Sequence, residues 1–202
     1  MTRPRSSPAR GSGDVAVAQV AGFALLLALI VVVVVAVTTY NAVVGMQRRV
    51  DKAWANIDVI LRQRHDELPA LVDAVRGALS FERTVLSDVT RARAGYVPEA
   101  SPAEQGRTSA TTSAAVRSLF GVMERYPDLR AEQNVSSLQA EIERLEELIA
   151  TRRELYNDTV YLYDAAIAQL PGLLFARFFG WTPREYFEAR EPVGDRVPVS
   201  LA

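Results

Sequence analysis

The chain of 202 residues has no cysteine and only one histidine, His65. The lack of cysteine excludes disulfides, thiol nucleophiles and cysteine-ligated metals, and it excludes a lipoprotein anchor, which needs a cysteine to acylate. One histidine cannot complete the paired Glu-x-x-His motifs of a di-iron bundle, so we predict no metal site. Neither a Gly-x-Ser-x-Gly motif nor a glycine-rich phosphate loop occurs, and we therefore predict no catalytic residues, no cofactor and no enzyme activity.

An excess of charge of one sign is also missing. Lys and Arg number 23 against 24 Asp and Glu, and the two signs are interleaved along the chain. Binding to a phosphate backbone needs a basic surface, so this balance argues against nucleic acid as a partner. No motif for a small-molecule substrate is found either.

What the chain does contain is one long apolar run. Residues 20–37 carry no charge, and the apolar flanks extend the run to 15–39. A helix needs roughly 20 such residues to cross about 30 Å of hydrocarbon, so we predict a membrane span with the lipid bilayer as its partner. A cleaved signal would have an apolar core of only about 7–15 residues and a small-residue cleavage site, which the residues around Ala36 fit poorly.

The chain is expected to cross this membrane once. Three basic residues precede the span and three follow it at a similar distance: Arg3, Arg5 and Arg10 against Arg48, Arg49 and Lys52. Because the excess of Lys and Arg sets the orientation of a span, this tie leaves the side of the soluble domain undetermined.

Apolar residues recur every seven positions over the first part of the soluble region. They include Val50, Trp54, Ile57, Leu61, Leu68, Leu71, Val75, Ala78, Val85 and Val89. Pro69 lacks an N–H and crowds the carbonyl of His65, yet the period keeps its phase across it. We predict one bent helix from Tyr40 to Ala94, kinked at His65–Pro69, with His65 on the helix surface.

A second heptad period runs from Val135 to Leu170, with Asn134 as the expected N-cap and Pro171 as the stop. A weaker helix is expected over 103–126. The fold class is therefore all-α: an N-terminal transmembrane helix that continues into an elongated antiparallel helical bundle over 40–190. The turn-rich segments 1–14 and 191–202 are expected to be a disordered tail and a C-terminal tail.

The end of the predicted bundle is rich in aromatic residues. Leu173–Phe179 predicts a short apolar helix, and Thr182 with Glu185 forms a capping box that predicts a last helix from Pro183. Such a segment, with Trp181 near its centre, needs cover from water. We expect it to close one end of the bundle, or else to face the membrane or a partner.

Several strings, in this order, make the chain resemble the LemA family of bacterial membrane-anchored helical proteins. They are Tyr40-Asn41, VDKAWANIDVILRQRHDELPALVDAV at 50–75, YPDLRA at 126–131, RRELYNDTVYLYDAAI at 152–167 and LPGLLFARFFGWTPREYFEA at 170–189. Leu170 and Asp164 depart from the residues common in the family, and the segment before the span is longer. The resemblance implies a single-pass anchor in the cytoplasmic membrane of a bacterium, with an antiparallel helical bundle, and it implies no active site.

Two arginines interrupt the apolar columns. Arg64 and Arg152 would each be costly to bury alone, so we expect each to pair with a carboxylate or to lie at a solvated rim. Asp58, Asp66 and Asp158 are the candidate partners. These pairs would fix the register of the helices, or they would belong to a groove for a partner.

The predicted helix lengths differ, at about 80, 35 and 55 Å. The stripe around Val50, Trp54 and Ile57 would then lack cover from its own chain, which indicates contact with a second copy or another membrane protein.

The predicted function is a non-enzymatic scaffold or adaptor that presents a helical bundle to protein partners. Two alternatives stay open. One is an accessory factor or regulator of a membrane protease or envelope-stress system, and the other is a bundle that senses or remodels lipid through its aromatic segment around Trp181.

Overall fold

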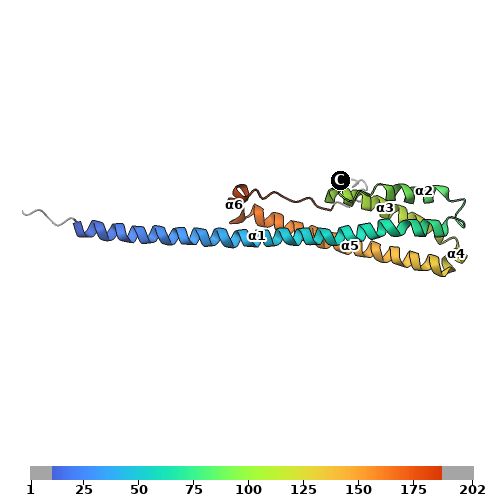
Figure 1. The fold of residues 1–202 in the computed structure, drawn as a ribbon, viewed down its shortest axis with the longest axis horizontal. Coiled ribbons are helices and arrows are strands. Elements are labelled where there is room, and N and C mark those ends of the chain that lie inside the picture. Colours follow the sequence, from blue (N-terminus) through green and yellow to red (C-terminus); the bar gives the residue numbers. More distant parts are fainter. Residues whose placement is uncertain (1–10, 188–202) are drawn as a thin grey trace, which may run out of the picture.

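A computed structural model describes residues 11–187, and it is helical with no strand in that range (Figure 1). The six helices are α1 Gly11–Val75, α2 Arg83–Ala94, α3 Pro102–Met123, α4 Pro127–Ala131, α5 Gln133–Ala168 and α6 Gly172–Phe179. The all-α prediction is confirmed. Of the two predicted tails, 191–202 and residues 1–10 lie outside the described residues, whereas residues 11–14 belong to α1.

Helix α1 has two parts that differ in their surroundings. Its first part contains the apolar run and projects from the bundle as a bare rod, with the described side chains of its most apolar stretch unburied (Figure 1). Its second part, from Tyr40 to Val75, packs along α5 in the bundle. Among the described residues, α1 is the one unbroken helix that is long and apolar enough to cross a membrane.

The prediction of one bent helix through Ala94 is wrong. Pro69 lies inside α1, which runs on to Val75, and the chain then reverses through 76–82 so that α2 returns beside α1 (Figure 1). The seven-residue period continues across the reversal because α1 and α2 both face the same core. Leu79 in the turn and Val89 of α2 are fully buried there. The turn is tied to the end of α3 by an ion pair of 2.7 Å between Glu82 and Arg125.

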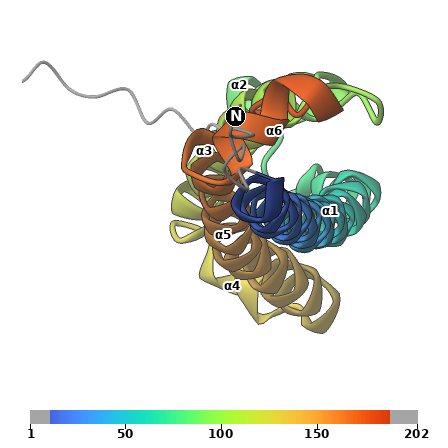
Figure 2. The ribbon, with the colours of Figure 1, turned by 90° about the vertical axis from the view of Figure 1, so that its left-hand side faces the viewer.

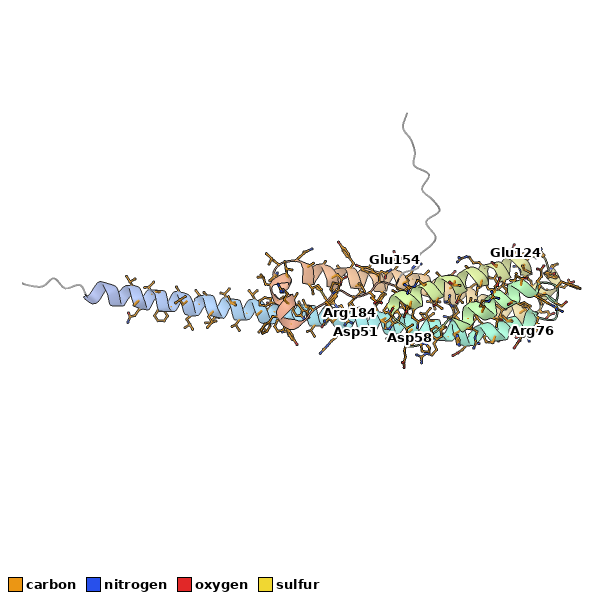
Figure 3. All side chains as sticks on the ribbon, turned by 90° about the horizontal axis from the view of Figure 1, so that it is seen from above. Asp51, Asp58, Arg76, Glu124, Glu154 and Arg184 are labelled. Atoms are coloured by element: carbon orange, nitrogen blue, oxygen red, sulfur yellow. The ribbon has the colours of Figure 1, made fainter. Side chains whose placement is uncertain are left out.

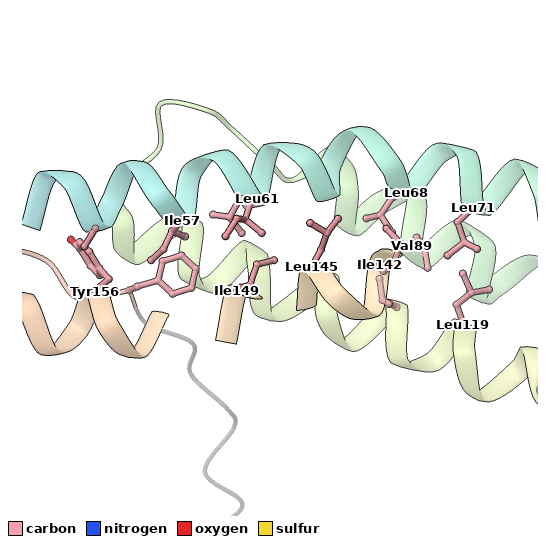
Figure 4. Packing of buried hydrophobic residues seen from close by; sticks show 14 of the residues in the cluster. Ile57, Leu61, Leu68, Leu71, Val89, Leu119, Ile142, Leu145, Ile149 and Tyr156 are labelled. Atoms are coloured by element: carbon pink, nitrogen blue, oxygen red, sulfur yellow. The ribbon is translucent and has the colours of Figure 1, made fainter. Parts of the chain in front are cut away.

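The main helix pair of the bundle is α1 with α5, and α2 with α3 covers it (Figure 2). Because α1 ends at Val75, its part beyond Tyr40 is about 54 Å long, the same as the length expected for α5. The predicted mismatch between the lengths of these two helices is therefore wrong. The prediction that the stripe around Val50 and Ile57 lacks cover from its own chain is also wrong, because both residues are buried. Figure 4 shows the core at this pairing, where Ile57, Leu61 and Leu68 of α1 face Ile142, Leu145 and Ile149 of α5.

The ends of the helices differ from the predicted ones by a few residues. A capping box of Ser101 and Glu104 begins α3. Helix α5 starts at Gln133 after Glu132, so Asn134 lies in its first turn rather than at its cap. Leu170 lies beyond the end of α5 and is exposed, which is why it does not continue the buried stripe.

The last helix predicted from Pro183 is absent over 183–187, where the described part of the chain ends, although the short apolar helix before it is present as α6. Helix α6 turns away from α5 by 95° and ends at Gly180, whose positive φ of 69° is a conformation that glycine adopts without strain. Residues 181–187, which we call the strap, then run back along the bundle without helical structure. The capping-box signal fails here because side chains of α5 bind the backbone groups of the strap that a helix would have used.

Candidate functional site

Arg64 lies in the core of the bundle with 3% of its surface exposed. Its guanidinium donates to Glu146 Oε1 of α5 at 2.6 Å and to the Oγ atoms of Ser109 and Ser113 of α3, both at 2.9 Å. Ser113 in turn donates to Glu146 Oε2. This polar cluster joins α1, α3 and α5 at one level, and a buried charge requires such partners.

The partners predicted for Arg64 were wrong. Asp58 faces the other side of α1 and pairs with Arg62 at 2.9 Å, whereas Arg64 points inward to α3 and α5. Glu146 was missed because it lies in a glutamate-rich stretch with Glu141, Glu143 and Glu147, and such a pattern is typical of a solvated helix face. Arg152 is half-buried on α5, and within residues 17–187 no ion pair to it is found.

His65 lies next to the polar cluster rather than on an open helix surface. Its ring packs against that of Tyr96 with centroids 4.9 Å apart and the planes tilted by 36°, and Arg93 Nε donates to its backbone carbonyl at 2.9 Å. The Nδ1 atom is buried without a hydrogen-bond partner in the described structure, beside a cavity of about 10 Å³ that is lined also by Arg64 and Gln105. Burial, and after it the charge of Arg93, lowers the pKa of His65 from its ordinary value of 6.5.

We expect the bundle to lose stability as the pH falls through 6.5. The folded chain holds the pKa of His65 below 6.5, so the unfolded chain binds its proton first, and the stabilisation by neutral His65 is present above pH 6.5 and is lost below it. The urea midpoint at about pH 5.5 and about pH 7.5 measures this loss. His65→Gln should remove this part of the pH dependence; an identical loss in both proteins would contradict the assignment.

The strap is fastened to one face of α5 by four side chains. Tyr156 and Asn157 lie seven residues before Tyr163 and Asp164, so the two pairs share a face. Tyr156 Oη donates to the Glu185 carbonyl at 2.8 Å and Tyr163 Oη to that of Thr182 at 3.1 Å. Asp164 Oδ1 accepts from the N–H of Arg184 at 3.1 Å.

Asn157 completes this ladder with a pair of hydrogen bonds to Phe187. Its Oδ1 accepts from the Phe187 N–H at 2.9 Å, and its Nδ2 donates to the Phe187 carbonyl at 3.3 Å. Burial raises the pKa of Tyr156 to about 12, so its hydroxyl keeps the proton that it donates. The sequence signal for this ladder is a dipeptide that occurs twice, seven residues apart. Each copy is a tyrosine followed directly by Asn or Asp: Tyr156-Asn157 and Tyr163-Asp164.

The strap also binds α1. The Arg184 side chain reaches Asp51 at 3.5 Å, and Figure 3 shows the two residues next to each other. Trp54, a predicted interaction residue, is half-buried, with its ring 5.6 Å from that of Tyr156 and 6.3 Å from that of Phe187. Phe187 itself is 1% exposed, so this end of the strap belongs to the core, whereas residues 182–186 are exposed.

Trp181, the other aromatic residue singled out in the sequence, is buried at the start of the strap with 9% of its surface exposed. Its ring stacks on that of Phe179 at 5.1 Å and lies 6.2 Å from that of Tyr40 on α1. Trp54 thus packs against one end of the strap and Trp181 forms the other end, whereas Arg64 belongs to the polar cluster. The aromatic segment does close the end of the bundle next to the apolar part of α1.

The fold and its contacts define a class: a helical bundle built on a long helix with a candidate membrane span, closed by a C-terminal strap. In a comparison with protein families, residues 53–200 match the LemA family. The chain belongs to the LemA family, as its sequence strings indicated.

Curated relatives carry the name of magnetosome proteins. The chain is 25% identical to MamQ 1 and MamQ 2 of Paramagnetospirillum magneticum, over 77% of this chain and 66% of theirs. It is 25% identical to MamQ of Magnetospirillum gryphiswaldense over 85% of this chain and 74% of that protein. The chain thus spans about two thirds of the length of the first two relatives.

Proposed function

We propose that the protein is a scaffold, anchored by residues 15–39 in the cytoplasmic membrane of a bacterium, that presents its helical bundle to protein partners. The observation that carries this proposal is the continuity of α1, a single helix of 65 residues from Gly11 to Val75. Because the same helix forms the candidate span and the central strut, the bundle is held at a fixed height and direction over the membrane.

The bundle offers a partner a surface that is apolar in places. Leu155 and Leu162 lie seven residues apart on the outside of α5 and are exposed, so they share one face that the rest of the described chain leaves uncovered. Residues of this kind are the anchors that helix-to-helix contacts use. A partner helix or a second copy of this chain fits such a face.

The experiment uses a photo-crosslinking amino acid at Leu155 or Leu162 of the full chain in intact cells. We expect a discrete adduct at both positions and none at the exposed Glu147 on the same helix. Glu substituted at one leucine should abolish the adduct at the other, while the protein stays in the membrane fraction after carbonate washing. An adduct of twice the mass of the chain identifies a second copy.

Two results would contradict the scaffold. Release of the full chain from membranes by carbonate would remove the anchor. Adducts that form equally at the two leucines and at Glu147, or at none of them, would mean that this face binds no specific partner.

A further inference from the structure

The end of the bundle beside the apolar run carries a second group of exposed apolar side chains. Leu174 of α6 is 69% exposed, Phe178 is 82% exposed, and Leu170 just before α6 is 71% exposed. Leu173 is also exposed, and the one charge in α6 is Arg177. Single exposed apolar residues are common on proteins, but a contiguous group on an eight-residue helix marks a contact surface.

The level of α6 along α1 is fixed by aromatic contacts. The Phe179 ring lies 5.0 Å from that of Tyr40, which is the first residue after the apolar run 15–39. Val37, the last residue of the apolar stretch 20–37, is only about 4.5 Å further along the helix. Helix α6 therefore lies at the level where the apolar run of α1 ends, and Figure 1 shows this position along α1.

The direction of α6 fits the same level. Helix α5 packs along α1, and α6 is turned from α5 by 95°, so α6 lies across the long axis of the bundle. If α1 crosses a bilayer, a helix in this direction runs along the membrane surface. Apolar side chains facing the acyl boundary, with a cationic residue and aromatic rings among the headgroups, are typical of helices that lie in a membrane interface.

We propose that α6 is a second membrane contact, inserted in the interfacial layer of the bilayer that α1 spans. Leu174 and Phe178 enter the acyl boundary, and Arg177 lies among the lipid phosphates. The proposal rests on the proposed anchoring and adds to it, because an anchor and α6 together fix the bundle upright. Trp181 does not touch lipid: it is buried against Tyr40 and fastens α6 at its level.

The absence of cysteine makes the test direct, because a single introduced cysteine carries the only label. The full chain is placed in vesicles of phosphatidylcholine and phosphatidylglycerol with an environment-sensitive fluorophore on Leu174→Cys or Phe178→Cys. Val33→Cys reports the span, and Phe81→Cys, exposed by 95% at the distal turn, is the matched control. Quenching by lipids that carry a nitroxide on the acyl chain measures contact with the bilayer.

We expect the labels at 174 and 178 to lose most of their emission, as at 33, while the label at 81 keeps its emission. The turn lies about 54 Å along α1 from Tyr40, out of reach of the acyl chains. Because Leu174 and Phe178 are exposed, their replacement leaves the core intact, and unchanged tryptophan emission of the bundle verifies this.

The other outcomes separate the two proposals. Quenching at 33 without quenching at 174 and 178 overturns the interfacial contact and leaves the anchor. No quenching at 33 overturns the anchor itself. Labels at 174 and 178 that are shielded from aqueous iodide but not quenched by lipid would mean that a protein or a second copy covers α6, which also overturns the proposal.

Discussion

Replacing Glu146 with alanine is expected to lower the free energy of unfolding of the bundle by about 3 kcal/mol. The change leaves the guanidinium of Arg64 in the core with two serine hydroxyls and no counter-charge. The Arg64 side chain is 4% exposed, so water cannot replace the carboxylate. Glu146 is 24% exposed, which places the loss at the lower end of what a broken buried pair costs.

Urea unfolding of the detergent-solubilised chain, followed by tryptophan fluorescence, measures this loss. Both tryptophans, Trp54 and Trp181, lie in the bundle, so the signal excludes the apolar part of α1. Glu147→Ala, at the exposed neighbour, should change stability by no more than about 0.5 kcal/mol. The double variant Arg64→Met with Glu146→Leu should recover much of the loss, because it removes both charges together. Equal effects of Glu146→Ala and Glu147→Ala would show that the cluster is solvated.

The heptad period predicted the helices and most of the core because burial itself has that period. Ile142, Ile149 and Tyr156 of α5 are buried where the pattern placed them. The same pattern did not reveal the reversal after Val75. Because α1 and α2 both face the same core, the seven-residue period of apolar residues continues from one helix into the other. Pro69, the stronger local signal, costs one helix hydrogen bond, which the packing of α1 against α5 outweighs.

The strap and the polar cluster depend on contacts between residues far apart in the chain, which local signals do not contain. The capping box at Thr182 was a valid signal for a helix. However, Asn157 and Tyr163 of α5 bind the backbone of the strap instead, and a tertiary hydrogen bond outweighs a local preference. Glu146 is likewise the partner of Arg64 only because the Arg64 side chain points inward, toward α5. This direction depends on the pairing of α1 with α5, which no local signal contains.

Replacing Phe187 with alanine is expected to lower the free energy of unfolding by about 3 kcal/mol and to loosen the end of the strap. The ring is 1% exposed and lies 6.3 Å from that of Trp54, so its loss leaves a cavity between α1 and α5. Water that enters this cavity should shift the emission of Trp54 to longer wavelength in the folded protein. The emission spectrum without urea and the urea midpoint together measure the effect.

Tyr186→Ala is the matched control, because Tyr186 is the neighbouring residue of the strap and its ring is exposed. We expect it to leave the emission of Trp54 unchanged and to cost less than about 1 kcal/mol. Phe187→Ala removes no hydrogen-bonding group, since Asn157 binds the backbone of residue 187, so a large effect reports packing of the ring alone. If the two variants were equally stable, the strap would be an attachment on the surface, and the bundle would be closed by α1, α3 and α5 without it.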